Sequence, residues 1–308
     1  MQSRSMNAKE WGMLLVLSLL WGSSFYFAEV ALADYPPFTL AFLRVLLAAA
    51  VLVSMALAMG HAFPASAAAW RRYTLLGLLS NAMPFCLIYW GQTAITGGLA
   101  SILTATTPFF TIILAHVLTN DEKFSLRKMF GVLTGIAGVA VIMGQDAFNG
   151  EEAFLPKLAV LGGAVCYAAA GVYGKRFMGE PLIVVSACQL VASALMLLPV
   201  MLAFEAGALV HMPSAQGAAA VAAVAVLSTA LAFLFYFRIL RSAGATNVVL
   251  VTLLVPVSAI VLGVVLLSEP LLARHLLGLA IIATGLVVID GRIFRPFAVR
   301  AKPSAENT

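Results

Sequence analysis

Of the 308 residues in this chain, 62% are hydrophobic and 10% are charged, and the formal net charge is +5. Soluble domains average about 45–50% apolar and about 25% charged residues. A water-soluble fold of this length could not bury so much apolar surface, so the composition excludes one and indicates a protein whose solvent is lipid. The positive charge does not indicate a nucleic-acid partner. Lys and Arg are distributed along the chain as in membrane proteins, where they mark the cytoplasmic connections.

Apolar segments of roughly the length that crosses a bilayer, about 20 residues, follow one another along the chain. They cover residues 12–32, 37–58, 73–95, 98–119, 126–144, 155–175, 182–204, 217–239, 245–267 and 274–291. The connections are short, and backbone groups in lipid must be paired within the segment, which favours helices. We therefore predict an all-α polytopic membrane protein with ten transmembrane helices and no soluble domain.

Lysine and arginine residues fall mainly in alternate connections between these segments. Fifteen lie in one set of connections, two (Lys157 and Arg274) lie in the other, and Arg44 lies inside a segment. Because cytoplasmic connections carry the excess of Lys and Arg, this bias predicts that both termini are cytoplasmic. The three cysteines lie inside segments without metal-ligand spacing, so we expect no metal and no cofactor.

The sequence matches itself when it is shifted by about 147 positions. The pairs brought together are Tyr89 with Tyr236, Glu122 with Glu269, Gly131 with Gly278, Gly138 with Gly285, and, at shifts of 148 and 145, Pro108 with Pro256 and Arg44 with Gln189. We predict two five-helix repeats, residues 1–148 and 149–295, followed by a disordered cytoplasmic tail, residues 296–308. Because five is odd, the second repeat would enter the membrane in the opposite sense, which is an inverted-topology duplication.

Inverted repeats predict alternating access, with a binding site near the midplane between them. Pro108 and Pro256 lie within the fourth segment of each repeat, and we predict that they are hinges beside the site; a tolerated kink is the alternative. Gly131, Gly138, Gly278 and Gly285 are predicted to let helices pack closely within the chain, with a homodimer seam as the alternative.

Several of these features occur together in one known family. They are Trp21-Gly22 in the first segment, Pro37 leading to Arg44 in the second, the proline of the fourth segment, the loop glutamate and the glycine-spaced fifth segment. In this order and duplicated, they resemble the EamA-type branch of the drug/metabolite transporter superfamily, from about residue 12 to 291. The resemblance implies a secondary carrier for small metabolites; members often export amino acids, purine derivatives or drugs.

Polar and aromatic side chains inside the segments are the candidates for substrate binding. These candidates are Trp21, Ser24, Tyr26, Arg44, Asn81, Tyr89, Gln92, Ser101, Thr104, Tyr167, Gln189, Ser228, Tyr236 and Thr252. Individually, Ser and Thr in lipid often bond to their own backbone, and Tyr and Trp often form interfacial belts. Together they form a neutral, aromatic path that suits a compact amphipathic or zwitterionic solute.

Arg44 is the one cation deep inside a segment, roughly 10 Å from its outer end by helix rise. A charge at this depth commonly has a functional role, and Arg44 would bind the carboxylate of an amino acid. Alternatively, its side chain could extend to the membrane–water interface or pair with Glu29. Because no acidic residue lies at mid-depth, gradient-driven transport without proton coupling is favoured.

We therefore expect a carrier that exports neutral or aromatic amino acids and related compounds from the cell across a bacterial inner membrane. Its partners would be a small-molecule substrate and the lipid bilayer, without nucleic acid, and it would be a monomer or a homodimer. An importer or a proton-coupled drug antiporter is the alternative within transporters. A channel or an intramembrane enzyme is the alternative outside them, but the sequence shows neither a filter nor a nucleophile paired with a base.

Overall fold

The computed structural model describes residues 6–118, 126–143, 154–209, 212–243, 248 and 250–290. Every regular element within these ranges is a helix. The helical segments that are long and apolar enough to cross a membrane are Ala8–Leu32, Pro37–Ala58, Ala67–Gln92, Gly97–Leu118, Phe154–Phe177, Leu182–Ala208 and Ala215–Ala243. The shorter apolar helices are Met129–Ile142, Val251–Leu267 and Ala273–Val288. The protein is therefore an all-helical polytopic membrane protein, as predicted, whereas Glu122 and the predicted tail lie outside the described residues.

The first two helices begin at positions that their sequences favour. Asn7 caps α1 (Ala8–Leu32): its side chain accepts a hydrogen bond from the Glu10 amide at 2.9 Å, and the Glu10 carboxylate accepts one from the Asn7 amide at 2.9 Å. This reciprocal pair satisfies two amides that the helix itself cannot. Helix α2 (Pro37–Ala58) begins with a proline, which has no amide hydrogen to leave unpaired at the first helical position.

Two of the membrane-spanning segments contain a π-helical turn in their middle. The first consists of α3 (Ala67–Gly77), the π-helical η1 (Leu78–Ala82) and α4 (Met83–Gln92). The second consists of α11 (Ala215–Ala225), η4 (Val226–Leu231) and α12 (Ala232–Ala243).

A local cause for each π-helical turn is present in the sequence. Pro84 follows η1 and has no amide to donate to the preceding turn. In η4, the Thr229 hydroxyl donates to the Val224 carbonyl at 2.9 Å and so enters the backbone ladder. The two turns begin 148 positions apart, which is the offset of the sequence repeat.

The two prolines predicted to be hinges occupy different positions in their helices. The fourth segment is broken into α5 (Gly97–Thr104) and α6 (Thr107–Leu118), and Pro108 lies in the first turn of α6, where a proline is tolerated. Pro256 instead lies inside α14 (Val251–Leu267), which continues through it. The two prolines are not equivalent in this conformation, and a hinge at either one stays a prediction.

The remaining helices complete the bundle. They are α7 (Leu126–Met143), α9 (Phe154–Gly174) with the short 3-10 turn η2 (Lys175–Phe177), α10 (Leu182–Glu205) with the 3-10 turn η3 (Ala206–Leu209), and α15 (Ala273–Asp290). Helices α2 and α10 pack against each other, as do α1 and α14, and α4 and α9. Large apolar side chains such as Leu133 and Leu195 are exposed on the outside, where lipid would cover them.

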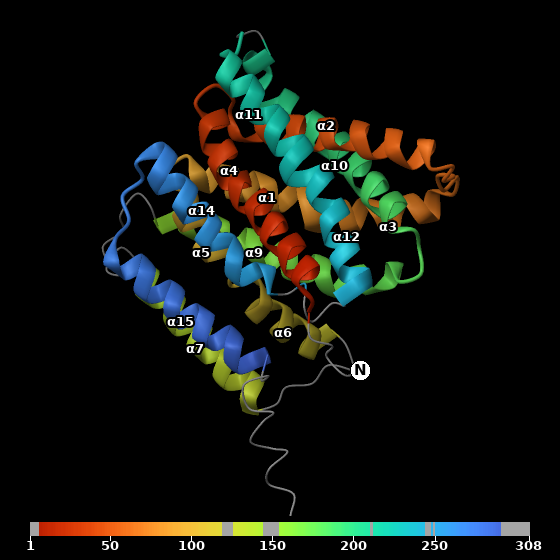
Figure 1. Ribbon diagram of the computed structural model, residues 1–308. Coiled ribbons are helices and arrows are strands. Elements are labelled where there is room, and N and C mark those ends of the chain that lie inside the picture. The colour runs from red at the N-terminus through yellow and green to blue at the C-terminus, as the bar shows by residue number, and fades with distance from the viewer. Residues whose placement is uncertain are drawn as a thin grey trace, which may run out of the picture.

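Helices α7 and α15 lie side by side at one edge of the bundle (Figure 1). A Cβ atom on Gly278 would lie 2.9 Å from the Gly138 carbonyl oxygen, and one on Gly285 would lie 2.8 Å from that of Gly131. The structure thus places all four predicted packing glycines in a contact within the chain, where only residues without a side chain let the two backbones approach so closely.

Candidate functional site

Arg44 lies buried inside the helix bundle, with 7% of its surface exposed. Its Nε donates a hydrogen bond to the Thr229 hydroxyl at 3.0 Å, and its Nη1 donates to the hydroxyls of Ser24 at 2.9 Å and Tyr89 at 2.6 Å. The guanidinium carbon also lies 4.0 Å from the ring centroid of Phe85, a cation–π distance. One cation is therefore held by α1, α4 and η4 as well as by its own helix.

All of these partners are neutral, so the positive charge of Arg44 is not balanced by an ion pair with any described residue. The predicted alternative partner, Glu29, accepts a hydrogen bond from the Gly97 amide at 2.7 Å instead. The Arg44 side chain is buried within the bundle rather than exposed at its surface. A desolvated cation that is held by neutral donors and acceptors is poised to bind an anionic group, because guanidinium and carboxylate form short, paired hydrogen bonds.

Gln189 takes the place equivalent to Arg44 in α10, and it makes an equivalent contact. The Ser80 hydroxyl, in η1, donates to Gln189 Oε1 at 2.8 Å, and the neighbouring Asn81 amide donates to the Ser80 hydroxyl at 3.0 Å. Arg44 meets Thr229 in η4, whereas Gln189 meets Ser80 in η1. Each π-helical turn thus supplies one hydroxyl to the residue in the middle of α2 or α10.

The sequence did not predict Ser80 or Thr229 as site residues, although it named their neighbours Asn81 and Ser228. Those neighbours are polar side chains inside the predicted segments, and the prediction treats these segments as continuous α-helices. A π-helical turn contains an extra residue, which shifts the side of the helix that faces inward. The proline at 84 was the signal that could have located the first turn.

The structure separates several other candidates from Arg44. Trp21 and Tyr236 pack against each other, with ring centroids 5.7 Å apart, in a cluster that includes Leu14 and Ile239. Tyr26 contacts Phe27 in the same helix, with ring centroids 5.2 Å apart. Tyr167, in contrast, lies near Arg44: it packs against the central apolar cluster to which Phe85 and Tyr89 also belong, and it interacts electrostatically with Arg44 and Tyr89.

The hydroxyl candidates of α5 bond to their own helix. Ser101 donates to the Gly98 carbonyl at 2.6 Å and Thr104 donates to the Ser101 carbonyl at 2.9 Å, so these two groups are satisfied locally. Ser228 pairs with Ser23 at 3.4 Å. Thr252 lies half-buried in the first turn of α14.

The buried amide Gln92 is only half satisfied. Its Nε2 donates to the Phe25 carbonyl at 3.1 Å, whereas its Oε1 has no hydrogen-bond partner among the described residues.

Two carboxylates meet at the first amides of α5. Glu29 Oε2 accepts from the Gly97 amide at 2.7 Å, and Glu269 Oε2 accepts from the Gly98 amide at 3.1 Å. The positive end of a helix stabilises such anions. Ser268, which has a left-handed backbone (φ 56°), reverses the chain after α14 and carries Glu269 back to this position. The sequence identified Glu269 only as the loop glutamate of the second repeat, so its pairing with Glu29 was not predicted.

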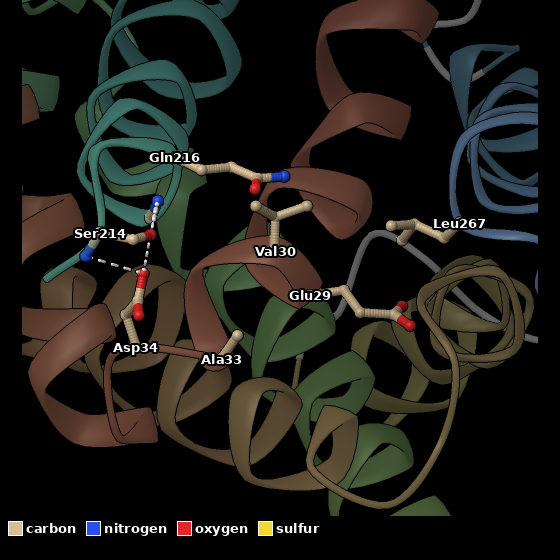
Figure 2. Close-up of a pocket in the computed structure, with 8 residues that line it drawn as sticks. Glu29, Val30, Ala33, Asp34, Ser214, Gln216 and Leu267 are labelled. Atoms are coloured by element: carbon tan, nitrogen blue, oxygen red, sulfur yellow. Dashed lines mark hydrogen bonds between the residues drawn. The ribbon is translucent and has the colours of Figure 1, made fainter.

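A cavity of about 270 Å³ opens beside these carboxylates, at the end of the bundle that contains the α1–α2 turn. It is lined by Glu29, Val30, Ala33, Asp34, Ser214, Gln216, Gly217 and Leu267. Asp34 accepts hydrogen bonds from the amide and the hydroxyl of Ser214, the residue that caps α11 (Figure 2). The α1–α2 turn is thereby joined to the start of α11.

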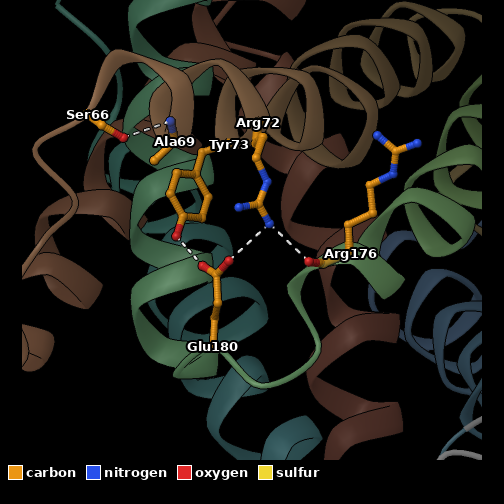
Figure 3. A network of polar contacts seen from close by, with 6 residues as sticks. All are labelled: Ser66, Ala69, Arg72, Tyr73, Arg176 and Glu180. Carbon is orange, nitrogen blue, oxygen red and sulfur yellow. Dashed lines mark hydrogen bonds and ion pairs between the residues drawn. The ribbon is translucent and has the colours of Figure 1, made fainter.

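A second polar cluster joins elements at the opposite end of the bundle (Figure 3). Arg72 in α3 donates to Glu180 Oε1 at 3.1 Å and to the Arg176 carbonyl at 3.0 Å, and the Tyr73 hydroxyl donates to the other carboxylate oxygen of Glu180. The Arg72 guanidinium also lies 4.7 Å from the ring centroid of Phe177. This cluster joins α3 to the connection between α9 and α10.

The architecture and the buried arginine can be compared with known proteins. The model of the EamA-like transporter family matches this chain twice, over residues 10–144 and 155–290. The chain belongs to the EamA-like transporter family. It is therefore a membrane transporter, and the predicted resemblance to that family is confirmed.

Several bacterial proteins are similar to this chain along most of their length. The uncharacterized transporter YoaV of Bacillus subtilis (strain 168) is 26% identical over 279 residues, which cover 89% of this chain and 94% of that protein. A probable amino-acid metabolite efflux pump of Escherichia coli (strain K12) is 27% identical over 304 residues, covering 92% and 95%. The uncharacterized inner membrane transporter YedA of Escherichia coli (strain K12) is 25% identical over 280 residues, covering 90% and 89%.

A solved crystal structure shares the fold. Its TM-score is 0.65 at 22% identity, and the match covers 92% of this chain and 98% of that one.

Proposed function

We propose that this EamA-like transporter is a secondary carrier that exports small amphipathic metabolites, with neutral and aromatic amino acids and related compounds as its substrates. The observation that carries the proposal is the burial of Arg44 among neutral groups from three other helical elements. An intramembrane cation without a counter-ion has a large desolvation cost, and a substrate carboxylate would offset that cost.

The surroundings of Arg44 support a substrate with one carboxylate and an apolar or aromatic side group. Phe85 and Tyr89 are stacked on each other with centroids 6.0 Å apart, and they offer ring surface beside the guanidinium. A phosphorylated substrate would call for several buried cations at one place. The hydrogen-bond and ring partners of Arg44 include no second cation, and the other buried lysine or arginine of the described residues, Lys157, lies near the start of α9.

Several observations support alternating access between two inverted five-helix repeats. The family model matches each half once. The two π-helical turns begin 148 positions apart. The contacts that Arg44 and Gln189 make with those turns are equivalent under nearly the same offset. A pair of repeats related in this way can exchange conformations, so that a central site opens to each side of the membrane in turn.

Export from the cytoplasm across a bacterial inner membrane is supported by the relatives, one of which is named a probable amino-acid metabolite efflux pump and another an inner membrane transporter. The second candidate function is proton-coupled antiport. The adjacency of Glu29 and Glu269 at the start of α5 favours it, because neighbouring carboxylates can share one proton. We propose that the protein is embedded in the lipid bilayer as a monomer or a homodimer. Its partner would be the small-molecule substrate, without a nucleic acid.

Counterflow in proteoliposomes tests this proposal. Vesicles loaded with unlabelled phenylalanine should accelerate the uptake of labelled phenylalanine by the reconstituted protein. Arg44→Gln should abolish the acceleration, whereas Arg44→Lys should retain part of it, because lysine keeps the charge but lacks the planar fork of donors. Uptake that does not respond to the internal substrate would indicate a channel, and full activity of Arg44→Gln would exclude Arg44 as the carboxylate-binding group.

A further inference from the structure

Two buried side-chain oxygens have no hydrogen-bond donor, and both lie at the end of the bundle that contains the α1–α2 turn, which we call the α1–α2 end. They are Gln92 Oε1, in the last residue of α4, and Glu269 Oε1, in the connection after α14; no described residue donates to either. A buried acceptor without a donor has a cost in free energy that the same atom does not have in water. Both oxygens therefore destabilise the closed arrangement of this end.

The Gln92 amide is held in the orientation that leaves its oxygen without a donor. Its Nε2 donates to the Phe25 carbonyl in α1 at 3.1 Å, and exchanging the two amide atoms would place an oxygen against that carbonyl. With 6% of its surface exposed, the residue has little access to water in this conformation. Gln92 thus joins the end of α4 to α1 and leaves one acceptor unsatisfied.

Glu269 cannot turn toward another donor, because its carboxylate is enclosed between α5 and α14. Its second oxygen, Oε2, accepts from the Gly98 amide at 3.1 Å. Cβ atoms on Gly98, in α5, and on Gly263, in α14, would each collide with the carboxylate. The end of α14 is therefore closed against the start of α5 around an acceptor that no donor reaches.

The opposite end of the bundle is paired more completely. Both carboxylate oxygens of Glu180 accept hydrogen bonds there, one from Arg72 and one from Tyr73 (Figure 3). Neither of the unsatisfied oxygens belongs to that end. The α1–α2 end also contains the cavity of about 270 Å³ whose lining includes Glu29 and Leu267. The two ends are thus unequal: one has unsatisfied acceptors beside open space, and the other has a paired cluster.

We propose that the α1–α2 end is a gate that opens by hydration of Gln92 Oε1 and Glu269 Oε1. On opening, the end of α14 would separate from the start of α5, and water would donate to both oxygens. The inference rests on the proposed alternating access, and it assigns the end that opens more readily from the conformation described here. In the predicted orientation this end faces away from the cytoplasm, so the gate would be the exit for an exported substrate.

The test measures how fast a polar maleimide labels a cysteine that the closed gate covers. Ile260 in α14 is 8% exposed and packs against α5, since a Cβ atom on Gly98 would lie 3.5 Å from Ile260 Cγ1. Ile260→Cys is introduced into a chain whose Cys86, Cys166 and Cys188 are replaced by alanine. The full-length protein is labelled in lipid nanodiscs, where both ends face the solvent. Labelling that is slow relative to opening follows the population of the open state.

We expect Gln92→Met to slow the labelling about tenfold, because it removes the unsatisfied oxygen and so stabilises the closed gate. The Phe25 carbonyl loses the Gln92 amide but lies inside α1, where a helical amide still donates to it. Gln92→Glu should accelerate labelling, because it buries a charge without a donor. The two changes have opposite expected signs, whereas a loss of packing alone would accelerate labelling in both.

Gln189→Met is the matched comparison. Gln189 is also a buried glutamine, 7% exposed, but its oxygen accepts a hydrogen bond from Ser80 at 2.8 Å. Its replacement removes no unsatisfied acceptor, so it should not slow the labelling of Ile260→Cys. Equal labelling rates with and without Gln92→Met, or equal slowing by Gln189→Met, would overturn the proposal.

A second reporter shows whether the effect belongs to one end. Ile183, near the start of α10, is 8% exposed and packs in the cluster that contains Tyr73, at the opposite end. Gln92→Met should not slow the labelling of Ile183→Cys. Slowing of equal size at both reporters would indicate a general stabilisation of the bundle and would also overturn the gate.

The outcome is separate from that of the transport assay, because labelling needs no substrate. If counterflow succeeded and labelling of Ile260→Cys did not respond to Gln92→Met, the carrier would stand without this gate. If counterflow failed while labelling responded as expected, the carrier proposal would fail and the gate would stand.

Discussion

Arg44 and Gln189 lie 145 positions apart in α2 and α10, and each is hydrogen-bonded to a hydroxyl of a π-helical turn from the other half of the chain. Arg44 donates to Thr229 at 3.0 Å, and Gln189 accepts from Ser80 at 2.8 Å. The geometry is therefore shared, while the chemistry differs: one contact contains a charge and the other does not. A site with this asymmetry can orient a substrate that has one anionic end.

This difference predicts unequal effects of removing the two hydroxyls. Thr229→Val keeps the shape of the side chain and leaves Arg44 Nε without its acceptor, which should cost about 1.5–3 kcal/mol, the range for a hydrogen bond to a charged group. Binding of phenylpropionate, a probe that carries a carboxylate without an ammonium, should weaken by about tenfold or more. Ser80→Ala removes a neutral hydrogen bond worth about 0.5–1.5 kcal/mol and should have a smaller effect. Titration of both variants with phenylpropionate checks this, and equal losses would contradict a special role for Arg44.

Much of the fold could be predicted from the sequence, because hydrophobic segments in lipid can satisfy their backbones in few ways. Arg44 could be singled out because placing a charged side chain in lipid costs much free energy. Ser80 and Thr229 could not, because α-helical periodicity gives no register across a π-helical turn.

Glu269 could not be placed from the sequence either. Ser268, a residue other than glycine with a left-handed backbone conformation, turns the chain back after α14. A turn made without glycine leaves no signal in the composition. The position of Glu269 depends on two glycines in other turns: Cβ atoms on Gly98 and Gly263 would each collide with its carboxylate. Contacts of this kind depend on tertiary structure, which local patterns do not encode.

The glycine contact between α7 and α15 predicts a loss of stability on small substitutions. Gly278→Ala places a methyl group 2.9 Å from the Gly138 carbonyl oxygen and against Ile142, and overpacking of this kind costs about 1–3 kcal/mol. The thermal midpoint in detergent should fall by several degrees. Gly171→Ala in α9 is the control, because a Cβ atom there meets nothing within 4 Å. A midpoint for Gly278→Ala equal to that of the control would show that the two helices separate without cost.

The cluster around Glu180 predicts a change in transport rate with little change in stability. The side chains of Arg72 and Glu180 are 43% and 31% exposed, and ion pairs of this exposure contribute about 0–1 kcal/mol. If α3 must leave the α9–α10 connection for this end to open, Glu180→Gln should accelerate counterflow by up to about fivefold. Its thermal midpoint should stay close to that of the wild type. Unchanged rates in both Glu180→Gln and Glu180→Ala would show that the cluster does not restrain the opening.

Removing charge from the Glu29–Glu269 pair should stabilise the protein at alkaline pH. Like charges in contact repel each other more strongly in a partly buried place than in water. Glu269→Gln keeps an oxygen for the Gly98 amide and removes one charge, so the thermal midpoint should rise at about pH 8. At about pH 5 the gain should shrink, because a proton on either carboxyl removes the repulsion in the wild type.

Glu205→Gln is the comparison for this prediction. Its carboxylate accepts amides of α2 and the Thr39 hydroxyl without a second carboxylate partner in the described structure, so its removal should lower the midpoint at about pH 8. Counterflow by Glu269→Gln, measured with and without a pH gradient, then decides the coupling. Flux that loses its response to the gradient would favour proton-coupled antiport, and flux that never responds, even in the wild type, would favour a carrier driven by its substrate alone.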